Sequence, residues 1–177
     1  MDYLAMNMFL SEDNIKRHLE HFRTYKLKYS IMEKSFPEIK SKTSSEILKL
    51  SISREIKEKL IFLLWQINSH KLYFDSFKER QEKAKNTKIN IEKLIFDTYS
   101  LAKDKEYGFI YIFVDKSGKI IQRYENTPGN AFIKYEPILA IDIYEHAYLF
   151  DYGYSFDKYL RASLTYLDIE KLSVNNS

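Results

Sequence analysis

Cysteine is absent from this chain of 177 residues. The protein can therefore form no disulfide, no thiolate metal site and no cysteine nucleophile. Long apolar runs are absent as well, since no stretch approaches the roughly 18–20 residues that a membrane-spanning helix needs. Asp2, Glu12 and Asp13 come too early for an Arg-rich transit peptide, and the first residues do not form a secretory signal. We therefore expect no membrane span and a location in the cytoplasm, or in the mitochondrial matrix if the targeting signal is not visible in this sequence.

An excess of charge of one sign is missing too. The 28 basic and 25 acidic residues give a net charge of +3 and are interspersed along the chain. A dedicated nucleic-acid-binding protein usually concentrates basic residues on one face, and no direct nucleic-acid motif is present. Hydrophobic residues make up 45% and aromatic residues 16% of the chain. This content predicts a packed interior, in one domain or in two small layers that share a core.

The first half of the chain has the periodicity of helices. Ser11 has the position of an N-cap, with Glu12 and Asp13 in the first turn. Apolar and aromatic residues then recur every three or four positions up to a break at Pro37. Asn90 has the position of a second N-cap. Three further helices are predicted by the same periodicity, over residues 45–50, 53–77 and 91–101.

The second half changes to the pattern of strands and turns. Three strands are predicted, over residues 108–114, 119–124 and 138–142. A closing helix is predicted over residues 156–172. Helices followed by a three-stranded antiparallel sheet with flanking helices make an α+β fold. We expect an N-terminal helical hairpin domain of residues 1–85 packed on a C-terminal α+β domain of residues 86–177, with any metal site at their junction.

The most informative run of the sequence is D-I-Y-E-H-A-Y at residues 142–148. Asp142 ends the third predicted strand, and His146 follows four residues later, across a turn into a helix. A carboxylate and an imidazole placed in this way can converge on one point, and the pair suits a first-row transition metal. The whole run resembles the D-V-W-E-H-A-Y segment of the iron/manganese superoxide dismutases.

A second similarity to this family lies in the long predicted helix. His70 falls on the apolar face of the helix, and Gln66 lies one turn earlier on the same face. An imidazole in a core needs a partner, which a metal ion provides. The run Q-I-N-S-H-K-L-Y-F at residues 66–74 is similar to the family's second helix, where a Gln precedes a His ligand by four residues.

The first predicted helix is also similar to that of the family. The stretch L-S-E-D-N-I-K-R-H matches, without a gap, the family's approach to its first His ligand, which places that ligand at His18. The family continues as H-x-x-x-H-H-x-x-Y, in which the Tyr guards the substrate funnel. In this register Phe22 replaces the second His, and Lys26 falls at the Tyr. A one-residue deletion after His18 would restore Tyr25, whereas a deletion before it would move the ligand position toward Arg17.

The resemblance covers about residues 10–172 and implies a superoxide dismutase. The implied ligands of one iron or manganese ion per subunit are His18, His70, Asp142 and His146. The ion would alternate between +3 and +2 while superoxide is converted to O₂ and H₂O₂. Gln66 would hydrogen-bond the solvent on the metal, and Tyr25 would guard the funnel. The metal stays open, because Gln66 is placed as in the iron type, whereas Glu125 stands near where the manganese type supplies its Gln.

The resemblance also implies a homodimer or a heterodimer with a related subunit. In the family, the acid before the last His ligand accepts a hydrogen bond from the partner's metal-ligating His, and Glu145 has this position. Phe22 and Leu149 replace two polar residues that bond to each other across the family's interface. Because both partners are lost together, we expect a repacked interface rather than a damaged one.

Other interpretations of these residues are open. Asp142 would also suit the cap of the following helix, Glu145 a surface acid, and Gln66 a polar residue at a helix edge. The alternative function is a catalytically inactive subunit with this fold, like the superoxide-dismutase-like proteins of mitochondrial ribosomal small subunits. A third possibility is another metal-dependent activity on the same scaffold. Bound metal separates the first two, because a structural subunit needs none.

Overall fold

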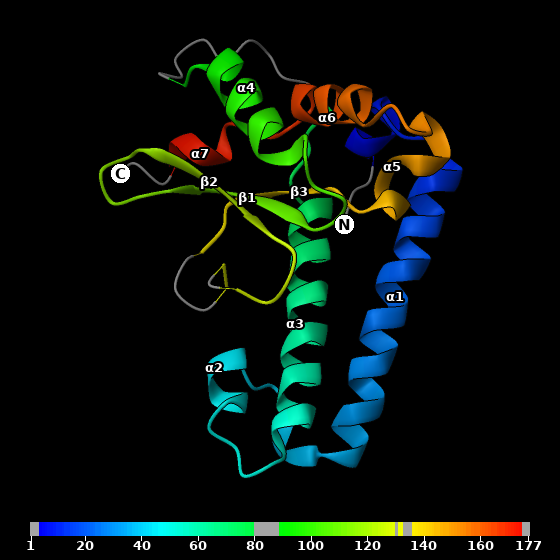
Figure 1. Ribbon diagram of the computed structural model, residues 1–177, viewed down its shortest axis with the longest axis vertical. Helices are drawn as coiled ribbons and strands as arrows, with labels where there is room; N and C mark the ends of the chain where they lie inside the picture. Colours follow the sequence, from blue (N-terminus) through cyan, green and yellow to red (C-terminus); the bar gives the residue numbers. More distant parts are fainter. Residues whose placement is uncertain (1–3, 80–88, 130, 133–135, 175–177) are drawn as a thin grey trace.

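Two long helices form an antiparallel hairpin that projects from the rest of the molecule (Figure 1). They are α1 (Glu12–Ser35) and α3 (Arg54–Phe74), which pack against each other. Three short helices accompany them: η1 (Leu4–Met8), η2 (Pro37–Ile39) and α2 (Ser44–Ile47). The computed structural model describes residues 4–79, 89–129, 131–132 and 136–174.

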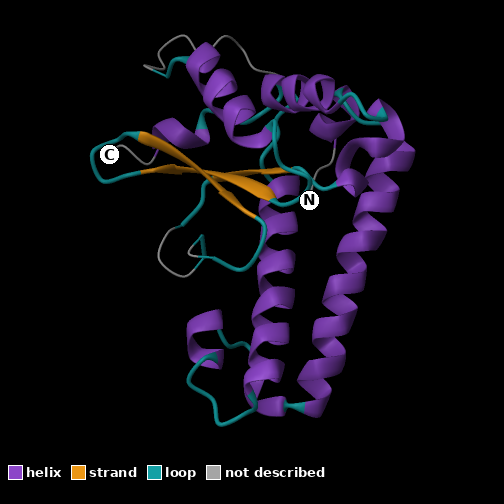
Figure 2. Cartoon of the chain, in the orientation of Figure 1, coloured by secondary structure: helices purple, strands orange, loops and turns teal. Residues whose placement is uncertain are grey.

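The C-terminal half is a small antiparallel sheet with helices around it (Figure 2). Its strands, in the order β2-β1-β3, are β1 (Phe109–Val114), β2 (Ile120–Glu125) and β3 (Leu139–Asp142). Its helices are α4 (Ile91–Ala102), α5 (Glu145–Tyr152), α6 (Phe156–Thr165) and α7 (Lys171–Val174). Helix α4 packs on β1 and β2, and α5 lies between α1 and α6. The predicted α+β fold, a helical hairpin on a three-stranded antiparallel sheet with flanking helices, is confirmed.

Local sequence signals set the helix ends. The hydroxyls of Ser11 and Ser53 accept hydrogen bonds from backbone N–H groups in the first turns of α1 and α3, and the Asn90 side chain does the same in α4. Helix α1 ends at Ser35, since Pro37 follows and the backbone before a proline is disfavoured in helical geometry. The predicted caps at Ser11 and Asn90 are therefore confirmed.

The β1–β2 hairpin depends on two glycines with backbone angles that other residues rarely adopt. Gly118 closes the turn with a φ of 81°, and Asp115 Oδ1 accepts hydrogen bonds from the backbone N–H groups of Ser117 and Lys119. Gly108 has a φ of 132°, and a Cβ there would lie 2.6 Å from the carbonyl oxygen of Glu125. The chain can thus enter β1 at this angle only with glycine.

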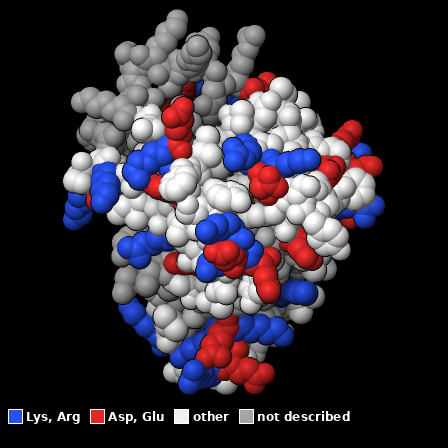
Figure 3. Space-filling model, turned by 45° about the horizontal axis from the view of Figure 1, so that its top comes forward, with Lys and Arg blue, Asp and Glu red and all other residues white. Residues whose placement is uncertain are grey.

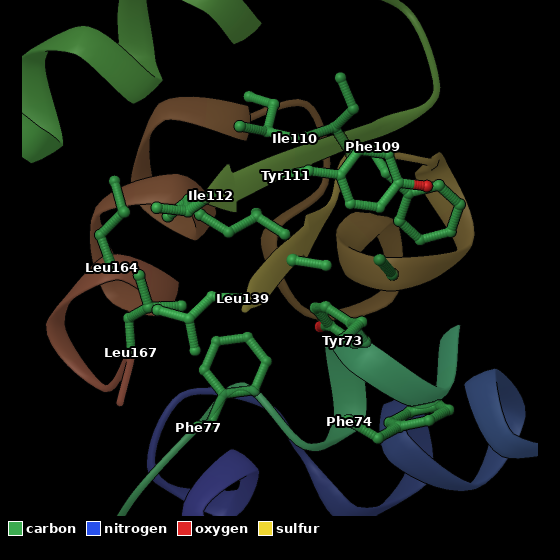
Figure 4. Close-up of a cluster of buried hydrophobic side chains, with 14 of the residues drawn as sticks. Tyr73, Phe74, Phe77, Phe109, Ile110, Tyr111, Ile112, Leu139, Leu164 and Leu167 are labelled. Atoms are coloured by element: carbon green, nitrogen blue, oxygen red, sulfur yellow. The ribbon is translucent and has the colours of Figure 1, made fainter. Parts of the chain in front are cut away.

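The main core lies between the sheet and the C-terminal end of α3 (Figure 4). Strand β1 contributes an unbroken buried run, which suits a central strand covered on both faces. The largest contributions from the end of α3 and the residues after it are Tyr73, Phe74 and Phe77. A separate, smaller core at the far tip of the hairpin is built from Ile39, Ile47 and Leu60. The sheet therefore holds one end of α3, and the tip closes on itself.

The predicted closing helix over residues 156–172 is wrong in its length. Helix α6 ends at Thr165, and α7 begins only at Lys171. Between them the backbone pairs with the chain that follows α3, since Asp168 N–H donates to Ser76 O at 2.8 Å. Leu167 is fully buried by this pairing. A tertiary contact has replaced the helical hydrogen bonds that the local periodicity predicted.

The predicted boundary between the two halves, at residues 85 and 86, lies outside the described residues, as does most of the basic segment 78–88. The division into two domains stays a prediction. Basic and acidic side chains alternate over the face shown in Figure 3, without a field of one sign. Within the described residues, no helix has the length and apolarity to cross a membrane.

Ser76 connects α3 to β3 and provides a test of this packing. Its buried Oγ accepts a hydrogen bond from Ala140 N–H at 2.8 Å and donates to Leu72 O at 2.7 Å. Ser76→Ala should lower the free energy of unfolding by about 1–3 kcal/mol, because the Ala140 N–H group would be buried without an acceptor. Urea denaturation measures this change. Ser163→Ala is the control, since the Ser163 hydroxyl is equally buried but bonds only within its own helix; equal losses in the two variants would contradict the prediction.

Candidate metal centre

Four side chains from four separate elements meet where the hairpin joins the sheet. They are His18 in α1, His70 in α3, Asp142 at the end of β3 and His146 in the first turn of α5. One donor atom from each lies within 4.8 Å of all the others. The first three side chains are fully buried, and His146 is partly exposed. The arrangement arises because α5 follows β3 after a short turn and packs against α1.

The donor atoms face a common point, and two of them, His70 Nε2 and His146 Nε2, share a hydrogen bond at 3.3 Å. Asp142 Oδ2 lies 3.1 Å from His18 Nε2, 3.3 Å from His146 Nε2 and 3.7 Å from His70 Nε2. Despite the short distance, Asp142 Oδ2 and His18 Nε2 are each buried without a hydrogen bond. Buried polar atoms normally have a partner. Three imidazoles and one carboxylate that converge in this way fit a first-row transition metal.

The protonation states of the carboxylate and the imidazoles also suit metal binding. Burial opposes ionisation of Asp142, but His146 and His18 outweigh this effect and hold the pKa of the carboxyl below its ordinary value. Burial lowers the pKa of His18, and it lowers the pKa of His70 to about 3. Near neutral pH the carboxylate is thus charged, and these two imidazoles are neutral. Metal binding requires deprotonated ligands of this kind.

Neighbouring groups fix the orientation of two of these side chains. His70 Nδ1–H donates to the carbonyl oxygen of Gln66 at 2.8 Å, which leaves Nε2 as the lone-pair nitrogen toward the cluster. Asp142 Oδ1 accepts from the backbone N–H of Tyr144 at 2.8 Å, which leaves Oδ2 for the cluster. Helix α5 has Tyr144 as its N-cap, without a side-chain hydrogen bond, so the interpretation of Asp142 as the helix cap is wrong. Tyr159 donates to the Asp142 carbonyl oxygen at 2.7 Å.

Gln66 borders the cluster and is fully buried, so it is not a residue of a helix edge. Its Nε2 donates to the hydroxyl of Tyr144 at 3.1 Å, and its Oε1 has no hydrogen bond. The Tyr144 ring stacks on His146, with centroids 5.3 Å apart. Burial raises the pKa of Tyr144, so the phenol stays neutral. Sequence reasoning missed Tyr144, although it lies inside the informative run at residues 142–148.

His21 and Tyr25 form the less buried side of the site. His21 Nε2 hydrogen-bonds Tyr25 OH at 3.1 Å, and the His21 ring lies 4.1 Å from that of His146. The Tyr25 ring lies 5.4 Å from that of His70, whereas Lys26 lies over Phe22. This placement favours the register with a deletion after His18. Burial lowers the pKa of His21 to about 4 and raises that of Tyr25.

Sequence reasoning passed over His21 as one of four histidines. The signal that could have found it is its spacing, since His21 lies four residues before Tyr25 and three after His18 on one helical face. Two other predicted residues lie outside the cluster. Glu145 is exposed in the first turn of α5. Glu125 Oε1 accepts from Ala131 N–H at 3.2 Å and so holds the loop after β2.

Comparison with known proteins identifies the family. The family model described as iron/manganese superoxide dismutases, C-terminal domain, matches residues 63–175, which is more than half of the chain. The chain belongs to the iron/manganese superoxide dismutase family. The residues matched by the superoxide dismutase family model include His70, Asp142 and His146. His18, in α1, lies before the matched residues. No curated protein matches the chain.

The lowered pKa values predict how stability depends on pH in the metal-free protein. The pKa of His70 is about 3 when folded, against about 6.5 when unfolded. Between these values the unfolded chain takes up a proton that the folded protein does not, so the free energy of unfolding should fall as the pH drops from about 7 to 4.5. His18 acts in the same direction. Protonation of Asp142 lowers the free energy of unfolding only below the ordinary pKa of 3.8, which lies outside this pH range.

Urea denaturation across this pH range measures the effect. Each such buried imidazole should contribute a slope of up to about 1.4 kcal/mol per pH unit. His70→Asn should reduce the slope by the share of one imidazole, because asparagine takes up no proton. A free energy of unfolding that does not change with pH over this range would contradict the assignment of neutral, buried histidines.

Proposed function

We propose that this protein is a superoxide dismutase, with one iron or manganese ion held by His18, His70, Asp142 and His146. The observation that carries the proposal is the convergence of these four donors in a member of the family, with Asp142 Oδ2 and His18 Nε2 buried without hydrogen bonds. A stable fold without metal would be expected to avoid two such atoms. A bound ion would supply their missing partner.

The reaction takes two superoxide anions and two protons to O₂ and H₂O₂. When bound, the ion supplies the redox chemistry, alternating between +3 and +2 as it takes an electron from one superoxide and gives one to the next. The chain has to supply the protons and admit the anion. Tyr25 and His21 are suited to this task, because they share a hydrogen bond at the less buried side of the donor cluster. Both are neutral near neutral pH, so the pair presents a phenol hydroxyl and an imidazole that can hydrogen-bond an incoming anion or solvent.

Gln66 would adjust the site without being a ligand. It lies one turn before His70, and its side chain is held by Tyr144, whose ring stacks on His146. Its buried Oε1 has no protein partner and is available to solvent or substrate in the site. A carboxamide held in this way sets the proton affinity of solvent beside it.

The catalytic prediction concerns Gln66→Leu. Metal content and fold should stay nearly unchanged, because all four donors remain. The rate of superoxide decay should fall by about 10–100-fold, since the amide that orients solvent and Tyr144 is lost. The measurement is superoxide decay after pulse radiolysis or stopped-flow mixing, with elemental analysis of the same samples, which also decides between iron and manganese. Gln122→Leu, which removes a partly buried amide on β2 that bonds Leu94 O, is the matched control.

The wild-type protein tests the proposal itself. If it carries metal in full and superoxide decays no faster than in buffer, the enzyme proposal is wrong, and this fold serves as a scaffold. If Gln66→Leu and Gln122→Leu lower the rate equally, the role of Gln66 is wrong, and the enzyme proposal stands.

We further propose that the protein forms a dimer through the face around α5. Glu145 is exposed beside His146, and Leu149 and Phe150 are exposed one turn later on the same helix. The acid would accept a hydrogen bond from the partner's metal-ligating histidine, which couples association to the orientation of a ligand. Burying the two apolar side chains would add to the stability of the interface.

Glu145→Ala should therefore weaken dimerisation and lower metal affinity by about 10–100-fold together. Sedimentation and metal analysis of the same samples measure the two effects. Glu92→Ala is the matched control, since Glu92 is also an exposed acid in the first turn of a helix. A Glu145→Ala protein that stays dimeric and fully metallated would contradict the prediction.

A further inference from the structure

The most unusual polar side chain next to the site is Asn14 in the first turn of α1. It is 1% exposed, and neither Nδ2 nor Oδ1 has a hydrogen bond. Among the described residues, only Asn14 and His18 have two buried polar side-chain atoms that both lack a hydrogen bond. A buried amide without partners lowers the stability of a fold, so such a group needs an explanation. The two residues lie one helical turn apart on the same buried face.

His18 lacks the support that His70 has. His70 Nδ1–H donates to the carbonyl oxygen of Gln66, four residues earlier. His18 Nε2 faces the donor cluster, but His18 Nδ1 has no acceptor. A neutral imidazole that presents Nε2 as a ligand carries its proton on Nδ1, and that N–H needs an acceptor to fix the ring. Asn14 is the residue four positions before His18.

We propose that Asn14 is a positioning residue for His18, and that its side-chain oxygen accepts the hydrogen bond of His18 Nδ1–H when Nε2 is committed to the metal. Residues four apart on a helix have Cβ atoms about 5–6 Å apart, within reach of these two side chains. The inference rests on the proposed metal site and adds to it an origin for the orientation of the α1 ligand.

This role predicts opposite effects on stability and on metal affinity. Asn14→Leu replaces an unpaired buried amide by an apolar side chain of similar size, so the melting temperature of the metal-free protein should stay the same or rise. Affinity for metal should fall by about 10–100-fold, because His18 loses the acceptor that orients it. A purely structural Asn14 predicts the reverse, with a lower melting temperature and unchanged affinity.

The experiment measures Mn²⁺ affinity by competition with a chelator, and anaerobic Fe²⁺ affinity in the same way, with melting temperatures of the metal-free proteins. Asn14→Asp is the conservative variant, because it keeps the acceptor oxygen, and it should retain affinity close to that of the wild type. Thr98→Val is the matched control, since it removes a buried polar group of α4 that bonds only Leu94 O. It should leave metal affinity unchanged.

The outcomes separate this inference from the proposed function. If the wild type binds neither ion, the metal site and the role of Asn14 are both wrong. If the wild type binds metal and Asn14→Leu binds it equally well, only the role of Asn14 is wrong. The same holds if Asn14→Asp loses as much affinity as Asn14→Leu. Weaker binding by the leucine variant that the aspartate variant restores supports the inference.

Discussion

The structure of the site depends on one buried carboxylate. Asp142 is fully enclosed and still ionised, because neighbouring imidazoles outweigh the effect of burial on its pKa. An unpaired charge in a core is very unfavourable, so the chain must bring compensating groups to it from every side. His18 comes from the hairpin and His146 from the helix after the strand. The packing of α1, α3 and α5 brings these groups to the end of β3.

The backbone around Asp142 is held as firmly as the side chain. Tyr159 of α6 donates to its carbonyl oxygen, and Ser76 accepts from Ala140 N–H two residues earlier. One strand end is thus tied to the helix that carries His70 and to the helix that closes the fold. Rigid placement matters here, because a metal ion tolerates only small errors in the positions of its ligands. The buried hydrophobic core of Figure 4 packs between the sheet and the end of α3 that carries His70.

The sequence predicted the parts of the site that depend on local patterns. Helical periodicity placed His70 on a buried face, and the run containing Asp142 resembled a known family. The break between α6 and α7 could not be predicted, because Leu167 pairs with a segment about ninety residues away in the chain. The register beyond His18 was ambiguous for another reason. A single sequence shows that a residue is missing but not where, and only the packing of Tyr25 against His70 favours one position.

The long helices are stabilised by two separate hydrophobic cores, one at the tip of the hairpin and the main core near the site. Ile39, Ile47 and Leu60 contact one another and nearby partly buried residues, whereas the main core begins again near the site. Local opening events in proteins follow such boundaries between contact clusters. We therefore expect the tip to open and reclose as a unit of its own, while the end of α3 that carries His70 stays packed on the sheet. Insertions, deletions or substitutions in the segment between α1 and α3 should accordingly leave the geometry of the metal centre unchanged.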